Sequence, residues 1–295
     1  MLQVILMYAI FASSFPITKI LLSYTAPFFL TGVRMITGGS ILLLYYSTYR
    51  KNRCSIAPSQ YLVYAQIVII GFYLNYIARF WSINYLSSAK AGLIFSLYPL
   101  ISSLLSYLFF KETVTKKQWL GFAFGLCSVA PLMVITSPLE STVGQLWFFS
   151  GPELAMLLSV IADCYKWILI RKLVLDHTCS PFMVNGLCMT AGGLLALLTA
   201  IPVEGLFPVK SLLPFILYMG LYILISNVIS YNLYGFLLRS YTVTFLSLAG
   251  FMAPLFAALY GWLFLHEHIS WHFYVSATML ACGLYLFYQD ELRNN

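Results

Sequence analysis

The sequence has very little charge: only 8% of its 295 residues are Asp, Glu, Lys or Arg, whereas 61% are hydrophobic. An average soluble domain carries roughly 25% charged residues, which keep its surface in water. A water-soluble fold of this size could not cover its surface from this composition. The low charge therefore argues against a soluble enzyme and predicts a surface that faces lipid.

Catalytic and metal-binding motifs are also missing. The sequence contains no HExxH, GxSxG or GxxxxGK[ST] pattern, and its six cysteines show no CxxC spacing. The motif HEH at 266–268 is too short to define a metal site. These absences predict a protein that is not an enzyme and has no metal or other cofactor.

A long basic stripe, typical of nucleic-acid binding, is absent as well. The formal net charge is +7, but the 16 Lys and Arg are spread in small groups between apolar runs. The chain opens with MLQVILMYAIFASSFP, which lacks the basic start and cleavage site of a secretory signal. We expect this stretch to be the first membrane span.

Long apolar runs are what the sequence has in abundance. A helix that crosses a hydrocarbon core of about 30 Å needs roughly 20 apolar residues. Runs of that length predict an all-α membrane protein of ten transmembrane helices. The predicted spans lie near 2–22, 27–47, 61–80, 88–110, 117–136, 153–170, 181–201, 212–234, 241–265 and 270–288.

Charge between the spans predicts their orientation. With the N-terminus inside, the inner loops and tail hold Arg50, Lys51, Arg53, Lys111, Lys116, Lys117, Arg171, Lys172, Arg239 and Arg293. The outer side has Lys210 in a loop, with Arg79 and Lys90 near span ends. Because Lys and Arg collect on the cytoplasmic side, we expect an inner-membrane protein with both termini in the cytoplasm.

The chain also repeats itself. A shift of 154 or 155 residues superposes identical prolines, glycines and glutamates, which chance matching of apolar residues would not favour. Such pairs include Pro27 with Pro181, Gly32 with Gly186, Gly39 with Gly193, Pro99 with Pro254 and Glu112 with Glu267. We therefore predict a first five-helix repeat over 1–140 and a second over 141–295.

Each half has an odd number of spans, so the second half must enter the membrane from the opposite side. Two inverted halves place a central cavity between them that either half can close, which is the architecture of alternating access. Without a nucleotide-binding motif, transport would be driven by a gradient or by exchange.

Two segments and one residue resemble those of a known family. The segments are FASSFPITK in the first span and NYLSSAKAGLIFSLYPLISSLLSYLFFKETVTKKQWLGFAFG around the fourth and fifth, and the residue is Arg34 in the second. The spacing Pro-x12-Glu occurs in both halves. The sequence is similar over nearly its whole length to the EamA-type ten-helix members of the drug/metabolite transporter superfamily. This resemblance implies secondary transport of a small organic solute.

Asp163 and Lys166 in the span 153–170 depart from the family's usual pattern. Asp163 lies near the membrane centre, where a carboxylate costs at least about 2.5 kcal/mol and usually faces a cavity or a partner. It is either a structural partner of Lys166 at i+3 or a counter-charge for a cationic substrate group or a proton. A shift of 150 places Ser13, Ser14 and Phe15 at the corresponding positions, as cavity residues or as close helix packing.

Polar residues of the third and eighth spans are further candidates. Asn75 and Arg79 share one helix face, and Asn227 lies in the symmetry-related span. Interhelical hydrogen bonds explain the two asparagines equally well. For Arg79, as for Lys19 and Lys90, we expect the side chain to snorkel to the interface.

Aromatic residues make up 17% of the chain, more than interfacial belts require. Phe95 and Tyr98 before Pro99, and Tyr231 in the eighth span, are placed to line a cavity. Such rings could stack a purine or hold a sulfonium by cation–π attraction.

Charged residues near span ends favour structural roles. We expect Glu112 and Glu267 to cap the helix that follows each of them. Arg34 is expected to be a structural partner of a neighbouring helix end.

Together these residues predict a carrier of a cationic or zwitterionic, partly aromatic solute. S-adenosylmethionine fits: its sulfonium and α-amino group suit Asp163, its carboxylate Lys166 or Arg79, and its adenine the aromatic rings. The sequence also resembles the S-adenosylmethionine carriers of this superfamily in obligate intracellular bacteria, which exchange it for S-adenosylhomocysteine.

Two alternatives stay open: an amino-acid or other small-metabolite exporter of the same superfamily, and a non-transporting membrane assembly protein. The expected partners are a small-molecule substrate and the lipid bilayer, with no nucleic acid. Ten spans can enclose a pathway in one chain, so a monomer is sufficient.

Overall fold

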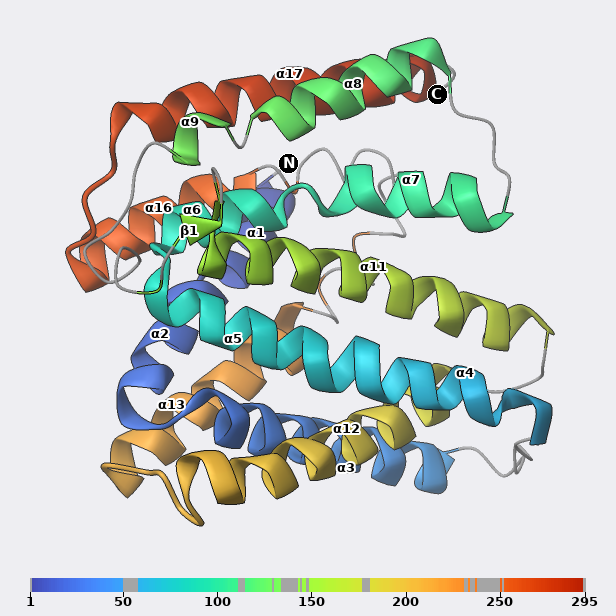
Figure 1. The fold of residues 1–295 in the computed structure, drawn as a ribbon, viewed down its shortest axis with the longest axis vertical. Coiled ribbons are helices and arrows are strands. Elements are labelled where there is room, and N and C mark those ends of the chain that lie inside the picture. The colour runs from blue at the N-terminus through green and yellow to red at the C-terminus, as the bar shows by residue number, and fades with distance from the viewer. Residues whose placement is uncertain are drawn as a thin grey trace. The chain divides into compact units, whose positions relative to one another are not determined.

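The structure of the protein is a computed structural model. It describes residues 2–49, 58–110, 115–128, 130–133, 145–146, 149–176, 181–230 and 252–293, with 143, 233, 237 and 250 as single positions. The described chain is almost entirely helical (Figure 1). Helices suit these apolar runs because a helix satisfies its own backbone hydrogen bonds in lipid.

The first part of the chain forms α1 (Leu2–Ala12), α2 (Ser14–Tyr24), α3 (Pro27–Tyr49), the 3₁₀ turn η1 (Pro58–Gln60), α4 (Tyr61–Gln66), the π-helix η2 (Ile67–Leu74), α5 (Asn75–Tyr85), α6 (Ser88–Phe95), α7 (Tyr98–Phe110), α8 (Lys116–Cys127) and α9 (Ala130–Met133). The second part forms β1 (Gln145–Leu146), β2 (Phe149–Ser150), α11 (Gly151–Asp176), α12 (Pro181–Glu204), α13 (Leu212–Ile223), the π-helix η3 (Leu224–Ser230), α16 (Met252–Leu265) and α17 (Trp271–Arg293). Within the described ranges, the only strands are β1 and β2, an antiparallel pair that the sequence did not predict.

The predicted helical membrane fold is confirmed. Five helical stretches of the described chain are long and apolar enough to cross a membrane: Leu2–Tyr24, Pro27–Thr48, Pro58–Tyr85, Ser88–Phe109 and Phe182–Glu204. Each agrees with a predicted span to within five residues at either end. The shorter apolar helices Leu212–Ser226 and Met252–Leu265 lie in two further predicted spans.

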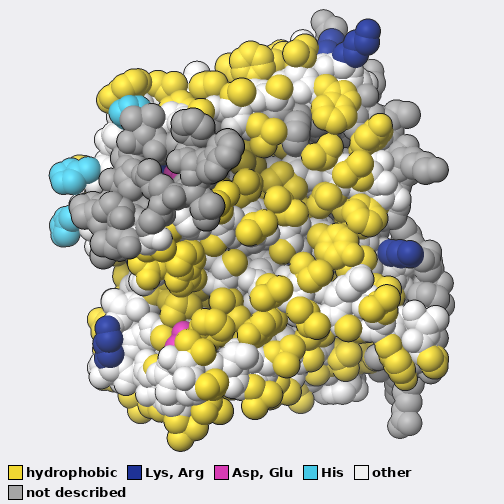
Figure 2. All heavy atoms as spheres, in the orientation of Figure 1, with side chains coloured by type: hydrophobic (Ala, Val, Ile, Leu, Met, Phe, Trp, Pro, Cys, Tyr) yellow, Lys and Arg dark blue, Asp and Glu magenta, His cyan; other side chains and the backbone are white. Residues whose placement is uncertain are grey.

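The surface is also that of a membrane protein. Hydrophobic side chains cover most of the face shown in Figure 2, and Lys and Arg appear at only a few places near its margins. Exposed side chains include Leu44, Leu62, Leu198 and Phe264, each at least 63% accessible. Such a surface is stable against lipid rather than water.

The chain divides into two compact units. The first consists of Met1–Ile20, Trp81–Leu157 and Gly220–Asn295, and the second of Leu21–Phe80 and Leu158–Met219. Each unit therefore draws segments from both halves of the sequence. Within the first unit α8 lies beside α17 and α6 against α16, and within the second α3 lies beside α12 (Figure 1).

Glycines bring α3 and α12 into close contact. A Cβ atom on Gly39 would lie 2.9 Å from the carbonyl oxygen of Gly186, and one on Gly32 would lie 3.1 Å from that of Gly193. Small residues of this kind let helix backbones approach in membranes. Gly39 follows Gly32 along α3, whereas its partner Gly186 precedes Gly193 along α12. The two helices therefore run antiparallel.

We expect Gly39→Ala to destabilise the protein, because its Cβ would meet backbone atoms that cannot move aside. Overpacking of this kind costs about 1–3 kcal/mol. The measurement is the midpoint of thermal aggregation of the detergent-solubilised protein. Gly220→Ala is the control, since a Cβ on Gly220 meets nothing within 4 Å; an equal midpoint in the two variants would contradict close packing of α3 on α12.

The first unit contains two ion pairs between its helices and loops. The Lys90 ammonium lies 2.5 Å from a carboxylate oxygen of Glu153, and the two side chains are only 6% and 3% exposed. The snorkelling predicted for Lys90 is therefore wrong, because the cost of burying it is offset by a carboxylate on α11. Lys19 is likewise paired, 2.6 Å from Glu267.

Glu267 caps a helix, as predicted, but a different one. Its Oε2 accepts a hydrogen bond of 2.7 Å from the backbone N–H of Ser88, the first residue of α6. The expectation was α17, the next helix in the chain. Glu112, its counterpart in the first half, lies outside the described residues.

Candidate functional site

The strongest polar cluster of the second unit centres on Asp163 of α11. Asp163 is 6% exposed and lies twelve residues after the start of its helix, roughly 18 Å along the axis at 1.5 Å per residue. α11 is 26 residues long, so the carboxylate lies near its middle. An uncompensated charge at that depth would be costly.

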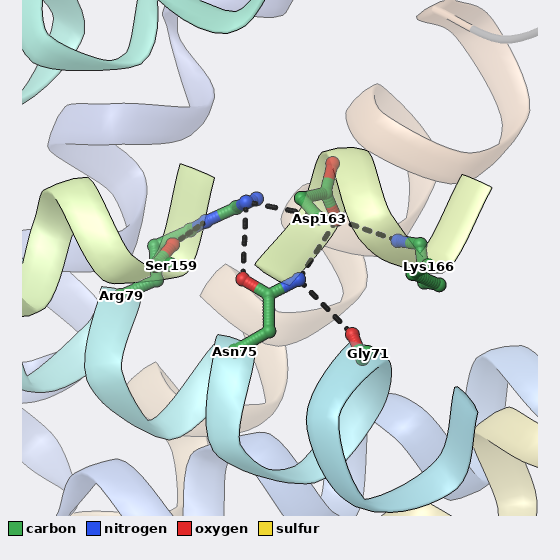
Figure 3. Close-up of polar contacts among 6 residues, drawn as sticks. All are labelled: Gly71, Asn75, Arg79, Ser159, Asp163 and Lys166. Atoms are coloured by element: carbon green, nitrogen blue, oxygen red, sulfur yellow. Dashed lines mark hydrogen bonds and ion pairs between the residues drawn. The ribbon is translucent and has the colours of Figure 1, made fainter. Parts of the chain in front are cut away.

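One oxygen of Asp163 collects three partners (Figure 3). Its Oδ1 lies 2.5 Å from the Lys166 ammonium, accepts a hydrogen bond of 2.8 Å from Asn75 Nδ2, and lies 3.8 Å from Arg79 Nη2. The predicted contact between Asp163 and Lys166 is thus present, and two residues predicted from another helix join it.

A polar stripe on η2 and α5 supplies the other side of the cluster. Asn75 Nδ2 also donates to the Gly71 carbonyl at 3.0 Å, and Arg79 Nη2 donates to Asn75 Oδ1 at 3.3 Å. Arg79 Nε donates to the Ser159 hydroxyl on α11 at 3.1 Å. Instead of snorkelling as predicted, Arg79 turns inward to α11.

The π-helix before Asn75 explains how this stripe is built. The Asn75 backbone N–H bonds to the carbonyl of Ile70, five residues earlier, rather than to that of Gly71. The Gly71 carbonyl instead accepts from the Asn75 side chain. π-Helical turns are rare and occur often at functional sites, and this one fixes the amide that binds Asp163.

Gly71 also makes room for Lys166. A Cβ on Gly71 would lie 2.6 Å from Lys166 Cγ and 2.7 Å from its Cβ. Any larger residue here would push the lysine away. The absence of a side chain at position 71 therefore lets the ammonium reach Asp163.

A row of aromatic side chains runs along η2 and α5, beside the polar stripe. The rings of Phe72 and Tyr76 stack with centroids 6.4 Å apart, and Phe80 meets Tyr76 edge-on at 5.9 Å. Lys166 Nζ lies 4.9 Å from the Phe72 centroid, and Arg79 Cζ lies 5.0 Å from that of Tyr76. These separations are typical of cation–π contacts.

Arg34 reaches this row from α3. Its guanidinium carbon lies 5.0 Å from the Tyr76 centroid and 5.6 Å from that of Phe80, and the residue is 9% exposed. These contacts place Arg34 against two aromatic rings, and its predicted contact with a helix end stays a prediction.

The other predicted site residues fall in the first unit. Ser13 forms the turn between α1 and α2, and its hydroxyl donates to the Ile10 carbonyl at 2.7 Å. The Ser14 backbone carbonyl accepts a hydrogen bond of 2.7 Å from the Thr18 hydroxyl. Both of these hydrogen bonds are local, joining residues three or four positions apart.

The predicted aromatics of that unit form a small cluster. The Phe95 ring lies 6.0 Å from Phe15 and 5.8 Å from Tyr98. Asn227 lies in η3, but its side chain is outside the described part of the structure, as is Tyr231 altogether.

Sequence reasoning missed the aromatic row and Ser159. Phe72, Tyr76 and Phe80 recur every four residues, one position after Gly71, Asn75 and Arg79. That spacing places the rings on a face adjoining the polar stripe and could have identified them. Nothing in the sequence points to Ser159.

Comparisons with known proteins give the family. The sequence model of the EamA-like transporter family matches residues 1–134 and again residues 151–289. A Chlamydia muridarum protein named S-adenosylmethionine/S-adenosylhomocysteine transporter is 31% identical over 293 residues, which cover 96% of this chain and 90% of that protein. A protein of the same name from Chlamydia trachomatis serovar L2 is 32% identical, covering 96% of this chain and 87% of its own.

The fold has a counterpart among solved structures too. One crystal structure superposes on this protein with a TM-score of 0.61, and the superposition covers 100% of this chain and 96% of the other chain. The sequence identity is 18%, so the likeness indicates a shared fold. The family match extends over nearly the whole length of this sequence. The chain belongs to the EamA-like transporter family.

Proposed function

We propose that this protein carries S-adenosylmethionine across the inner membrane and exchanges it for S-adenosylhomocysteine. The observation that carries the proposal is the identity of 31% and 32% to two chlamydial proteins of that name, over 96% of this chain. The site of the second unit offers groups that match this substrate.

The charged cluster suits the amino-acid end of the substrate. Asp163 would bind the α-ammonium group, and Lys166 or Arg79 the carboxylate. A zwitterion that enters the ion pair between Asp163 and Lys166 gives each of these two buried charges an opposite partner. The desolvation cost, which is severe for an unpaired ion, is thereby limited.

The aromatic rings beside the charged cluster suit the sulfonium of the substrate. A sulfonium is a cation that prefers the face of an aromatic ring, an attraction worth about 2 kcal/mol when it is desolvated. The row that includes Phe72 and Tyr76 already holds ammonium and guanidinium groups. We also retain Ser13, Ser14, Phe15, Phe95, Tyr98, Asn227 and Tyr231 as proposed substrate residues.

For the whole chain we propose ten spans in two inverted five-helix repeats, over 1–140 and 141–295. The family model matches the sequence twice, over 1–134 and 151–289. Helices recur at the predicted shift: α3 begins at Pro27 and α12 at Pro181, and α8 begins at Lys116 and α17 at Trp271.

Contacts between α3 and α12 support the inversion. Gly32 meets Gly193, and Gly39 meets Gly186. Because Gly32 corresponds to Gly186 and Gly39 to Gly193, each contact is the symmetry copy of the other. The equivalent helices α3 and α12 thus run in opposite directions, which supports an inverted repeat.

Both halves also carry a π-helix at the corresponding place. η2 covers Ile67–Leu74 and η3 covers Leu224–Ser230. Irregular helices near matching positions of two repeats are typical of transporter binding regions. The excess of Lys and Arg in the inner loops supports two cytoplasmic termini, and one chain is sufficient for the pathway.

The test is uptake of labelled S-adenosylmethionine into proteoliposomes that contain the purified protein and are preloaded with S-adenosylhomocysteine. We expect uptake that stops when the internal S-adenosylhomocysteine is omitted. Protein-free liposomes are the control. No uptake alongside amino-acid flux would instead identify an amino-acid carrier.

Replacing Tyr76 with Leu distinguishes the two substrate classes. Loss of the ring should lower uptake of S-adenosylmethionine about 10-fold or more, since a desolvated cation–π contact is worth about 2 kcal/mol. A carrier that recognises only the α-amino and α-carboxylate groups would change much less. The measurement is the initial rate at subsaturating substrate.

A further inference from the structure

The Lys166 ammonium lies among aromatic rings as well as beside a carboxylate. We infer that it occupies the sulfonium subsite of the substrate-free carrier, as a tethered competitor that a sulfonium displaces and a neutral thioether does not. Lys166 thereby sets how strongly the carrier prefers S-adenosylmethionine to S-adenosylhomocysteine. The inference rests on the proposed function and gives Lys166 a role in specificity beside its contact with the substrate's carboxylate.

Three rings lie close to the ammonium. Lys166 Nζ is 4.9 Å from the Phe72 centroid, 5.2 Å from that of Trp167 and 5.7 Å from that of Tyr76. Each distance is within the range of about 6 Å in which a ring face attracts a cation. All four residues belong to the second unit. Several rings around one point are the arrangement with which proteins bind cations that have no hydrogen-bond donors.

A sulfonium suits these rings better than the lysine does. An ammonium is compact and strongly hydrated and carries three N–H donors, for which a ring offers no oxygen acceptor. Asp163 provides one, since its Oδ1 lies 2.5 Å from Lys166 Nζ (Figure 3). A sulfonium has no N–H donor to satisfy, so it leaves water for a ring face at lower cost. Competition for the rings therefore favours the sulfonium.

The substrate also supplies a new partner for the displaced ammonium. Lysine has a flexible aliphatic stem, so the Lys166 ammonium can turn from the rings to the carboxylate of S-adenosylmethionine, while Asp163 takes the α-ammonium group. S-adenosylhomocysteine has the same carboxylate and ammonium but a neutral sulfur. It gives the rings no cation, so the lysine keeps them. The two substrates thus bind to different arrangements of one side chain.

The experiment measures the dissociation constants of S-adenosylmethionine and S-adenosylhomocysteine by calorimetric titration of the purified full-length protein in detergent. The compounds share their ammonium, carboxylate and adenine, so the ratio of the two constants isolates the sulfonium. We expect Lys166→Met to raise the preference for S-adenosylmethionine about 10-fold, because its sulfonium then gains the rings without displacing a cation. Methionine is unbranched and fits the space over Gly71, whose Cβ would lie 2.6 Å from Lys166 Cγ.

Lys172→Gln is the matched control. It removes a positive charge from an exposed position of the same helix, α11, so it should leave the ratio unchanged. Lys166→Arg is the second test, and it serves if Lys166→Met does not fold. A guanidinium is more weakly hydrated than an ammonium and stacks on aromatic faces, so it is harder to displace. We expect it to lower the preference for S-adenosylmethionine about 3-fold.

The outcomes separate the inference from the function on which it rests. An unchanged ratio in folded Lys166→Met, including equal weakening of both compounds, overturns the inference and leaves the transport function standing. The same holds if Lys172→Gln raises the ratio equally, or if Lys166→Arg binds with a ratio at or above that of the wild type. If the wild type binds neither compound, the proposed function fails, and the inference fails with it.

Discussion

Replacing Asp163 with Asn should abolish uptake while leaving the protein inserted in the membrane. The variant removes the only carboxylate that contacts Lys166 and Arg79 within the described residues, and the substrate's ammonium group loses its counter-charge. Loss of one partner from a buried charge pair costs about 3–5 kcal/mol, so we expect uptake of S-adenosylmethionine to fall at least about 100-fold. The assay is initial uptake in proteoliposomes at matched protein content.

A double variant separates folding from transport. Asp163→Asn with Lys166→Met removes both charges of the pair, so it should recover thermal stability lost by Asp163→Asn alone, without recovering uptake. Stability is measured as the melting midpoint in detergent. Normal uptake by a well-inserted Asp163→Asn protein would show that the carboxylate has only a structural role.

Replacing Gly71 with Ala should have the second largest effect, although it adds only one methyl group. The new Cβ would lie 2.6 Å from Lys166 Cγ, so either the lysine or the helix must move. Displacing the ammonium from its position 2.5 Å from Asp163 should lower uptake about 10- to 100-fold, comparable to loss of a charge-assisted hydrogen bond.

Gly220→Ala is the matched control, because Gly220 also lies in an apolar helix but has open space around its Cβ position. Since Ala is the better helix former, this control should keep full uptake and at least normal stability. Equal uptake by the two variants would mean that the approach of Lys166 over Gly71 is not needed for transport.

Much of the fold could be predicted from composition and periodicity. The five long apolar stretches agree with predicted spans because the length of a membrane helix is fixed by bilayer thickness. The interruption of the first span at Ser13 and the π-helices could not be predicted in this way. They depend on local hydrogen bonding, which hydropathy does not register.

The candidate site was predictable within each helix but not between helices. Lys166 follows Asp163 by three residues, and Arg79 follows Asn75 by four, so each pair was visible in the sequence. Tertiary packing alone determines that Asn75 binds Asp163 and that Arg34 reaches Tyr76. The sequence predictions for Lys90 and Arg79 assumed that a cation near a span end seeks water, whereas both have partners inside the protein.

The crossing of α3 and α12 has a consequence for how the two proposed repeats recognise each other. Its two glycine contacts are copies of each other, so the interface is self-complementary: one helix sequence is enough to specify both surfaces. Under the proposed inverted repeat, a half-length chain inserted in both orientations could pair with a second copy of itself through this crossing. In the predicted alignment of the two halves, Asp163 and Lys166 stand where the first half has Ser13 and Pro16, so the two copies differ where the candidate site lies.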